Sequence, residues 1–271
     1  MEMCRPETLG EALDLLAAQP HAVLLAGGTD VMVEVNLRRF RPEVVVSTRR
    51  VPDLLEATDR FIGAGVTFAR LESSPHRALA EAARAVGSPQ IRARGTIGGN
   101  LGTASPAGDS LPFLAAAGAE VLAAHRGGRR RIGVADFLTG PKRNTLRPGE
   151  MILGVVLPDD TPERQAFSKV GRRQAMTIAA ASVCVLRGDD GETRVALGAV
   201  GPTVLRAAEA EAFAAEAFVS EAAPSEAMLD EFQRLASKAA RPVTDHRATA
   251  EYRRRAVGVI ARRALQRVMA Q

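Results

Sequence analysis

Residues 91–109 read IRARGTIGGNLGTASPAGD, and this stretch is the most informative part of the sequence. Glycines, hydroxyl side chains, one amide and one carboxylate follow one another here, and the segment is too rich in glycine to pack as core. Paired glycines let the backbone approach a ligand closely and tolerate positive φ, so that successive N–H groups can converge on an anion. A segment of this kind usually shapes a binding site rather than a scaffold.

A second glycine pair lies earlier in the chain, in the segment Ala26-Gly27-Gly28-Thr29-Asp30. The apolar run His21–Leu25 before it predicts a buried strand, and Thr29 with Asp30 can cap a helix that begins with the apolar segment Val31–Val35. Each glycine pair alone is ordinary turn chemistry. Together, the two turns offer the backbone donors that a diphosphate needs when no single helix N-terminus receives it.

Other nucleotide and hydrolase motifs do not fit the sequence. A Rossmann fingerprint needs G-x-G-x-x-G between a strand and a helix, but Phe68 stands where the third glycine would follow Gly63-Ala64-Gly65. The P-loop combination of glycine, lysine and a hydroxyl residue is missing, and Ser105 lacks the flanking glycines of a G-x-S-x-G nucleophile elbow. The two glycine turns therefore remain the best candidates for a nucleotide site.

The composition is that of a globular protein without the sequence features of a metal site or a membrane span. Of the 271 residues, 46% are hydrophobic and 25% charged, and no apolar run reaches the roughly 18 residues of a transmembrane helix. The N-terminus lacks the basic and apolar regions of a signal peptide, and Cys4 and Cys184 form no disulfide framework, so we expect a cytoplasmic protein. Two thiolates are too few for an iron–sulfur cluster, and the four histidines have no metal-ligand spacing.

The formal net charge of +5 comes mostly from arginines, several of which gather in the segment Arg253–Arg267. Apolar residues alternate with these arginines at helical spacing, which predicts an amphipathic helix with a solvated basic face. The chain has one tyrosine and no tryptophan, and therefore no aromatic platform on which bases could stack. We expect a protein partner with acidic patches rather than a nucleic acid.

Hydrophobic periodicity divides the chain into three parts. Residues up to about 55 are expected to form one subdomain and residues from about 56 to 162 a second one. After Pro158–Pro162 the composition changes, and a hairpin followed by helices predicts an α+β domain with its helices against one sheet face. The expected strands are His21–Leu25, Val44–Ser47, Arg60–Gly65, Ala119–Ala124, Arg129–Val134, Met151–Leu157, Ala179–Leu186 and Thr193–Val200, and the expected helices are Thr8–Leu16, Thr67–Leu71, Pro75–Val86, Leu111–Ala116, Glu209–Phe218, Ser225–Ala240 and His246–Ala270.

The two glycine turns and two later blocks resemble the FAD-binding subunit or domain of the molybdenum hydroxylases. This group includes the medium chains of carbon monoxide dehydrogenases and the flavin domains of xanthine dehydrogenases. The later blocks are Lys169-Val170-Gly171-Arg172-Arg173 with Ile178-Ala179 behind it, and Asp245 followed by Ala250-Glu251-Tyr252-Arg253-Arg254. The blocks occur in the family's order and are specific for it.

The resemblance implies an α+β fold made of two domains. An FAD-binding domain of the PCMH type would occupy residues 1–162, with subdomains of about 1–55 and 56–162. A C-terminal domain of the carbon monoxide dehydrogenase flavoprotein type would follow at residues 163–271, with a small antiparallel sheet and helices.

FAD is the cofactor that the resemblance implies, and the two glycine turns are expected to hold its diphosphate. The N–H groups of Ala26–Asp30 and of Thr96–Asn100 would donate to the phosphate oxygens. The side chains of Thr29, Thr96 and Asn100 would add charge-assisted hydrogen bonds worth about 1.5–3 kcal/mol each.

Further residues are expected around the rest of the cofactor. Lys169 suits the pyrimidine edge of the flavin, where a cation favours the reduced ring, and Asp109 suits the ribose or the adenine because a carboxylate only accepts hydrogen bonds. Met176 and Ile178 are expected to flank the ring. The full set of expected cofactor-binding residues is Leu24, Leu25, Ala26, Gly27, Gly28, Thr29, Asp30, Val31, Thr96, Ile97, Gly98, Gly99, Asn100, Ser105, Asp109, Ile152 and Lys169.

In such a protein the flavin performs the redox chemistry, so no catalytic acid, base or nucleophile is expected from the chain. We expect an electron-transfer subunit of a molybdenum hydroxylase complex, which passes electrons from iron–sulfur clusters through FAD to an external acceptor. The implied partners are a large molybdopterin-binding subunit and a small 2Fe–2S subunit, assembled as a dimer of heterotrimers. Two alternatives stay open: a free-standing FAD-dependent oxidoreductase without molybdenum partners, and a chain that has lost its cofactor and serves as a scaffold.

Overall fold

A small parallel sheet forms the first lobe of the structure, a computed structural model that describes residues 1–173, 176–218 and 224–271. The strand order is β1-β3-β2, and helices or single turns connect the strands. The predicted helix that follows Thr8 is confirmed, since the Thr8 hydroxyl accepts from the Glu11 N–H at 3.2 Å. The elements of this lobe are β1 (Glu2–Cys4), α1 (Leu9–Ala18), β2 (Val23–Leu25), α2 (Val31–Asn36), β3 (Val44–Ser47), η1 (Thr48–Arg50) and η2 (Pro52–Leu54).

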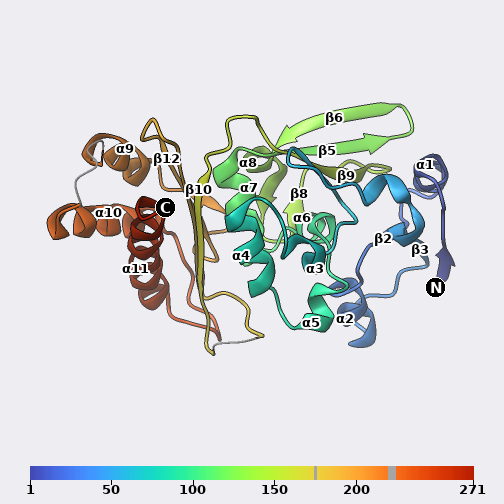
Figure 1. Cartoon of the computed structure of the whole chain (residues 1–271). Coiled ribbons are helices and arrows are strands. Elements are labelled where there is room, and N and C mark those ends of the chain that lie inside the picture. Colours follow the sequence, from blue (N-terminus) through green and yellow to red (C-terminus); the bar gives the residue numbers. More distant parts are fainter. Residues whose placement is uncertain (174–175, 219–223) are drawn as a thin grey trace.

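The second lobe is built on an antiparallel sheet in the order β4-β9-β5-β6. The predicted hairpin across Gly127-Gly128 is confirmed, and its two strands extend beyond the rest of the sheet at the top of Figure 1. The strands are β4 (Phe61–Gly63), β5 (Glu120–His125), β6 (Gly128–Gly133), β7 (Leu138–Gly140), β8 (Arg143–Asn144) and β9 (Met151–Val156). The helices are α3 (Phe68–Leu71), α4 (Arg77–Ala85), α5 (Pro89–Arg92), α6 (Ile97–Thr103), α7 (Leu111–Ala117) and α8 (Val134–Phe137).

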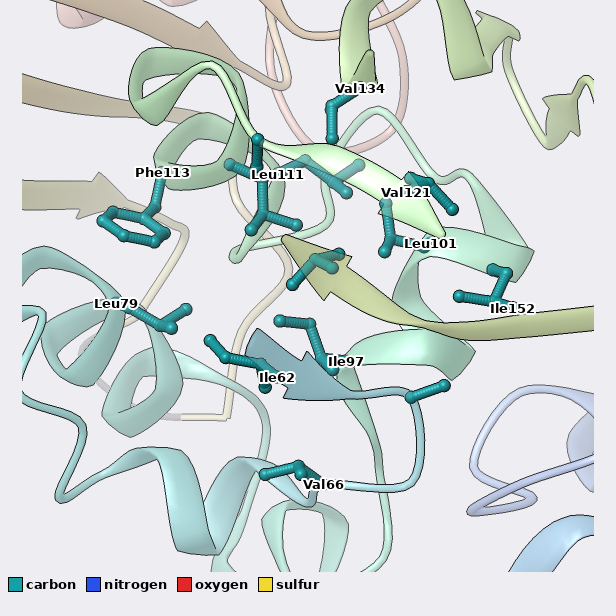
Figure 2. Close-up of a cluster of buried hydrophobic side chains, with 14 of the residues drawn as sticks. Ile62, Val66, Leu79, Ile97, Leu101, Leu111, Phe113, Val121, Val134 and Ile152 are labelled. Atoms are coloured by element: carbon teal, nitrogen blue, oxygen red, sulfur yellow. The ribbon is translucent and has the colours of Figure 1, made fainter. Parts of the chain in front are cut away.

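The second glycine turn is not a loop, because its residues open helix α6. Thr96 is the N-cap, and its hydroxyl accepts from the Gly99 N–H at 3.0 Å. Glycine is a poor helix former, so the sequence alone does not indicate this helix. Ile97 and Leu101 lie one turn apart and are fully buried in the core cluster of Figure 2, together with Ile62 of β4. Burial of these two side chains compensates for the low helix propensity of the glycines.

The C-terminal part is an antiparallel sheet in the order β10-β11-β12-β13, covered by helices on both faces. Figure 1 shows α9, α10 and α11 on one face and α4 and α7 of the second lobe on the other. The predicted hairpin and three helices are confirmed, whereas the edge strand β10 was not predicted. The elements are β10 (Arg164–Val170), β11 (Ala181–Arg187), β12 (Thr193–Gly198), β13 (Leu205–Arg206), α9 (Ala208–Ala217), α10 (Glu226–Ala239) and α11 (Ala250–Met269).

Both faces of this sheet are buried, and the alternation along β10 decides which side chains face the second lobe. Phe167 and Cys184 belong to the core of the N-terminal lobes, whereas Ala166 and Val183 belong to the core beneath the C-terminal helices. Because side chains alternate along a strand, Lys169 lies on the same face as Phe167. This places Lys169 toward the N-terminal lobes, although it comes from the C-terminal sheet.

The described part of the chain contains no helix that combines the length and apolar character needed to cross a bilayer. Within the same residues, no group of three or more histidine, cysteine, aspartate or glutamate side chains could hold a metal ion.

Candidate functional site

A cavity of about 970 Å³ lies between the two N-terminal lobes and the segment 176–178. The first glycine turn and α2 contribute from one lobe, and α6, the loop 105–109 and β9 contribute from the other. The volume is at the upper end of what small-molecule sites usually offer, about 300–1,000 Å³. An extended ligand therefore fits here better than a small metabolite.

Most of the predicted cofactor-binding residues meet in this cavity. The exceptions are Leu25, Ile97 and Lys169, of which Ile97 points into the core instead. Met176 and Ile178, expected beside a flavin ring, both line the cavity and are 57% and 55% exposed. The predicted residues that line it are Leu24, Ala26, Gly27, Gly28, Thr29, Asp30, Val31, Thr96, Gly98, Gly99, Asn100, Ser105, Asp109 and Ile152.

The first glycine turn connects β2 to α2 and lies directly on the backbone of Arg94 and Gly95. A Cβ atom at Gly27 would come within 2.0 Å of the Arg94 carbonyl oxygen, so no side chain fits there. Gly28 has a φ of +77°, which favours glycine. Strand β2 is half-buried, not buried as predicted. The predicted helix start is confirmed, although Asp30 makes no side-chain cap and instead accepts from the Thr103 hydroxyl at 3.3 Å.

The backbone N–H groups of this turn are available to a ligand. Those of residues 27–31 donate to no acceptor within the described parts of the chain. A run of unpaired donors at a turn is a typical anion-binding arrangement, because successive N–H dipoles add at one point. The first turn therefore has the property that the sequence predicted for it.

The second glycine segment does not share this property, which corrects the expectation for Thr96–Asn100. The N–H groups of Ile97 and Gly98 donate to carbonyls of the strand-end segment 64–66, at 3.1 and 3.0 Å. Gly99 donates to the Thr96 hydroxyl and Asn100 to the Thr96 carbonyl. These four donors, and the Thr96 hydroxyl as acceptor, are used within the protein because the segment is a helix start packed against β4.

The second segment contributes two glycines without side chains, Gly98 and Gly99, and the side-chain amide of Asn100 to the cavity wall. A Cβ atom at Gly98 would come within 2.5 Å of the Ala64 Cβ, whereas at Gly99 the nearest atom is the Thr96 hydroxyl oxygen at 3.1 Å. Gly98 is therefore required by packing, and Gly99 leaves space on the cavity side. The Asn100 Oδ1 atom accepts from the Ser110 hydroxyl at 2.7 Å, which orients the amide.

Asp109 and Lys169 form a buried ion pair at the edge of the cavity. Lys169 Nζ lies 2.6 Å from Asp109 Oδ2 and donates to the Ala85 carbonyl at 2.9 Å, and each of the paired side chains is 8% exposed. Burial raises the pKa of Asp109 to about 6, while the ammonium of Lys169 works in the opposite direction. Asp109 Oδ1 is buried without a partner among the described residues. This oxygen is therefore an acceptor that the described residues leave unused at the edge of the cavity.

This pair changes two expectations. Lys169, expected beside the flavin, is buried and lines a neighbouring cavity of about 750 Å³ rather than the large one. Because Asp109 contacts Lys169 directly, Asp109 cannot serve the adenosine while Lys169 lies beside the flavin ring at the other end of the dinucleotide. The structure places the two residues together and not at opposite ends of the cavity.

The sequence did not point to Lys142, which lines the large cavity from the turn between β7 and β8. The pattern Gly140-Pro141-Lys142 predicts a turn but does not show what the turn faces. Its place at the cavity follows from the packing of the turn against the end of α6, a contact between residues about 40 positions apart.

Two sequence families match this chain. Residues 1–160 match "FAD binding domain in molybdopterin dehydrogenase", and residues 165–268 match "CO dehydrogenase flavoprotein C-terminal domain". The nicotinate dehydrogenase FAD-subunit of Eubacterium barkeri is 36% identical over 192 residues, which cover 65% of this chain and 65% of that subunit. The carbon monoxide dehydrogenase medium chain of Afipia carboxidovorans is 31% identical over 285 residues, which cover 98% and 96% of the two chains.

A solved structure has the same fold. In the carbon monoxide dehydrogenase of Hydrogenophaga pseudoflava, determined without the Mo-pyranopterin moiety of its cofactor, one chain superposes with a TM-score of 0.87 and 30% sequence identity. The superposition covers 100% of this chain and 97% of that one.

Proposed function

This chain belongs to the family of FAD-binding subunits of the molybdenum hydroxylases, and from this membership we propose that it binds FAD in the cavity between its N-terminal lobes and relays electrons through it. The electrons would come from iron–sulfur clusters of a partner and leave to an external acceptor. Cys4 and Cys184 are the only cysteines in these 271 residues, which therefore cannot supply the four thiolates of such a cluster.

One observation carries the assignment: a single cavity combines unpaired amide donors with an unpaired buried acceptor. The N–H groups of residues 27–31 match the anionic diphosphate, and Asp109 Oδ1 matches a hydrogen-bond donor of the flavin. A dinucleotide that carries both groups fits a cavity of this volume. The two features would be left unsatisfied by an apolar ligand.

FAD supplies the redox chemistry when it is bound, and the side chains of this protein bind and orient it. We propose that the first turn holds the diphosphate and that Asn100 presents its amide to the same part of the ligand. Asp109 would accept a hydrogen bond at the flavin end, and Lys169 would keep that carboxylate in place. Ile152, Met176 and Ile178 would supply the apolar contacts for the ring.

The family relationship favours a subunit of a larger complex over a free-standing flavoprotein. The relatives that match nearly the whole chain are medium chains, a name given to one part of a multi-subunit enzyme. We propose that this chain forms a heterotrimer with a large molybdopterin-binding subunit and a small 2Fe–2S subunit, and that two such heterotrimers form a dimer. We also propose a cytoplasmic location. We also propose residues 1–162 and 163–271 as the two domains.

The test is a visible absorption spectrum of the full chain after incubation with FAD and removal of free ligand. We expect flavin bands at one equivalent per chain, and copurification with molybdopterin- and 2Fe–2S-containing chains when the host's own complex is isolated. Absence of flavin both from the isolated chain and from its complex would overturn the assignment and leave only the scaffold alternative.

A further inference from the structure

The turn between β7 and β8 holds Lys142 at the rim of the large cavity in a backbone conformation that lysine rarely adopts. The φ angle of Lys142 is 56°, in the left-handed region. Lys142 directly follows Pro141, at the turn position where glycine or asparagine is usual when φ is positive. Strained non-glycine residues of this kind gather at ligand sites, where the surrounding structure holds them in place.

Two hydrogen bonds fix this turn to the end of helix α6. The Lys142 N–H donates to the Ala104 carbonyl at 3.0 Å, and the Asn144 side-chain amide donates to the Gly102 carbonyl at 2.9 Å. Ala104 is the left-handed C-cap of α6 and leaves its carbonyl outside the helix. The lysine backbone is thus attached to the helix that forms one wall of the cavity.

Lys142 is the only cationic side chain among the described residues that line this cavity. Three carboxylates line it as well, those of Asp30, Glu34 and Asp109. Asp109 is paired with Lys169, but Asp30 and Glu34 still outnumber the single ammonium of Lys142, so the wall would repel a diphosphate unless this cation and the amide donors of residues 27–31 act together. The single ammonium therefore carries much of the attraction for an anion.

The ammonium is held only loosely by the protein itself. Lys142 Nζ lies 3.9 Å from Glu34 Oε1, beyond hydrogen-bond distance, and the two side chains are 60% and 32% exposed. Glu34 belongs to α2, the helix that begins where the run of unpaired amides ends. The lysine thus approaches the first glycine turn from the opposite lobe.

We propose that Lys142 binds the diphosphate of FAD together with the backbone donors of residues 27–31, and that Glu34 competes with the ligand for the same ammonium. This proposal rests on the proposed function. It adds a cationic contact from the second lobe, so that the anion is held by both walls of the cavity.

The test is titration calorimetry of the full chain with FAD, with ADP, which shares the diphosphate, and with riboflavin, which lacks phosphate. Lys142→Met should weaken FAD and ADP binding about tenfold, the size of one charge-assisted hydrogen bond, and leave riboflavin unchanged. Lys142→Arg should stay within about threefold of the wild type, because the charge is kept. Arg143→Met is the matched control, since Arg143 is the next residue but does not line the cavity.

Glu34→Gln tests the competition. It should tighten FAD binding more when Lys142 is present than in the Lys142→Met background, where only the direct repulsion between Glu34 and the diphosphate is removed. Lys142→Gly removes the charge and relieves the backbone at once, so it should lose affinity without lowering the midpoint of thermal unfolding.

Equal FAD affinity of wild type and Lys142→Met would overturn this proposal and leave the proposed function intact. Equal weakening of ADP and riboflavin binding would overturn it too, because the lysine would then act on the fold and not on the phosphate. Failure of the wild type to bind FAD would overturn both this proposal and the proposed function.

Discussion

Lys169 Nζ lies 2.6 Å from Asp109 Oδ2, and this contact joins strand β10 of the C-terminal sheet to the loop that precedes α7. Both side chains are 8% exposed, and the second oxygen of the carboxylate has no partner among the described residues. An unpaired, buried carboxylate oxygen is costly for the folded chain alone. We therefore interpret it as a feature kept for ligand binding.

The ionisation of Asp109 should lower the stability of the folded protein as the pH rises. Its pKa is about 6 in the folded chain against an ordinary value of 3.8, so the folded state binds the proton more tightly than the unfolded state. The resulting stability is full below about pH 4 and is lost as the pH rises through 6, with a total of about 3 kcal/mol. Asp109→Asn cannot ionise. Urea unfolding from pH 4 to 8 should show the difference in stability, variant minus wild type, increasing across this window; parallel profiles would contradict it.

The two kinds of glycine in the cavity should respond differently to alanine. Gly27→Ala places a methyl group 2.0 Å from the Arg94 carbonyl oxygen and should cost about 2–3 kcal/mol of unfolding free energy. Gly102→Ala is the matched control. No atom lies within 4 Å of its Cβ, and the residue is in helix α6, so the variant should gain about 0.5–1 kcal/mol. Chemical denaturation measures both, and equal effects would show that the close approach at Gly27 is not needed.

Gly99→Ala should separate ligand binding from folding. The added methyl group meets the Thr96 hydroxyl at 3.1 Å and otherwise faces the cavity, so stability should change by less than about 1 kcal/mol. The same methyl group reduces the space for a bound dinucleotide, and FAD affinity should fall. Calorimetric titration alongside a thermal melt checks this. Unchanged affinity with full stability would mean that the ligand does not approach this helix start.

Arg253 should be essential for the C-terminal part of the fold and not replaceable by lysine. It is 4% exposed, and its guanidinium donates to the Ala180 and Ala199 carbonyls at 2.9 and 2.8 Å and to Asp245 at 2.6 Å. The planar guanidinium of arginine reaches all three acceptors, whereas the single ammonium of a lysine cannot bond to them in the same geometry. Arg253→Lys should lose about 2–3 kcal/mol of unfolding free energy. Wild-type stability of the lysine variant in urea would contradict this.

Asp245, the partner of Arg253, should give the opposite pH dependence to Asp109. Partial burial works against its ionisation, but hydrogen bonds from two backbone N–H groups and from Arg253 outweigh this and lower the pKa to about 2. A lowered pKa stabilises the fold above about pH 4, and that stability is lost as the pH falls through 2. Asp245→Asn should cost about 2 kcal/mol at pH 7 and much less at the acid end, as measured by urea unfolding at both pH values.

Much of the fold was predictable from local patterns in the sequence. The hairpin at Gly127-Gly128 and the helix after Thr8 are confirmed because turn chemistry and capping act within a few residues. The edge strand β10 was missed. Its side chains face two different cores, so that both faces are buried and the usual alternation of polar and apolar residues is absent.

In the candidate site, too, the features that depend on a local pattern were predicted and those that depend on distant segments were not. The first glycine turn was predicted with its residues and its free donors, since a strand followed by paired glycines and a helix start is a local pattern. The second glycine segment was placed correctly at the cavity, but its amides are not free. The carbonyls they bond to belong to the segment 64–66, about 30 positions earlier.

The sequence by itself determined the two glycine segments and the family, because these depend on turn residues and ordered motifs. Only the tertiary structure decided which donors stay unpaired, that Asp109 meets Lys169, and that Lys142 reaches the cavity. These features depend on contacts between segments tens of residues apart. Hydrogen bonding and burial there are set by how the sheets and helices pack against each other, and local sequence does not encode such pairings.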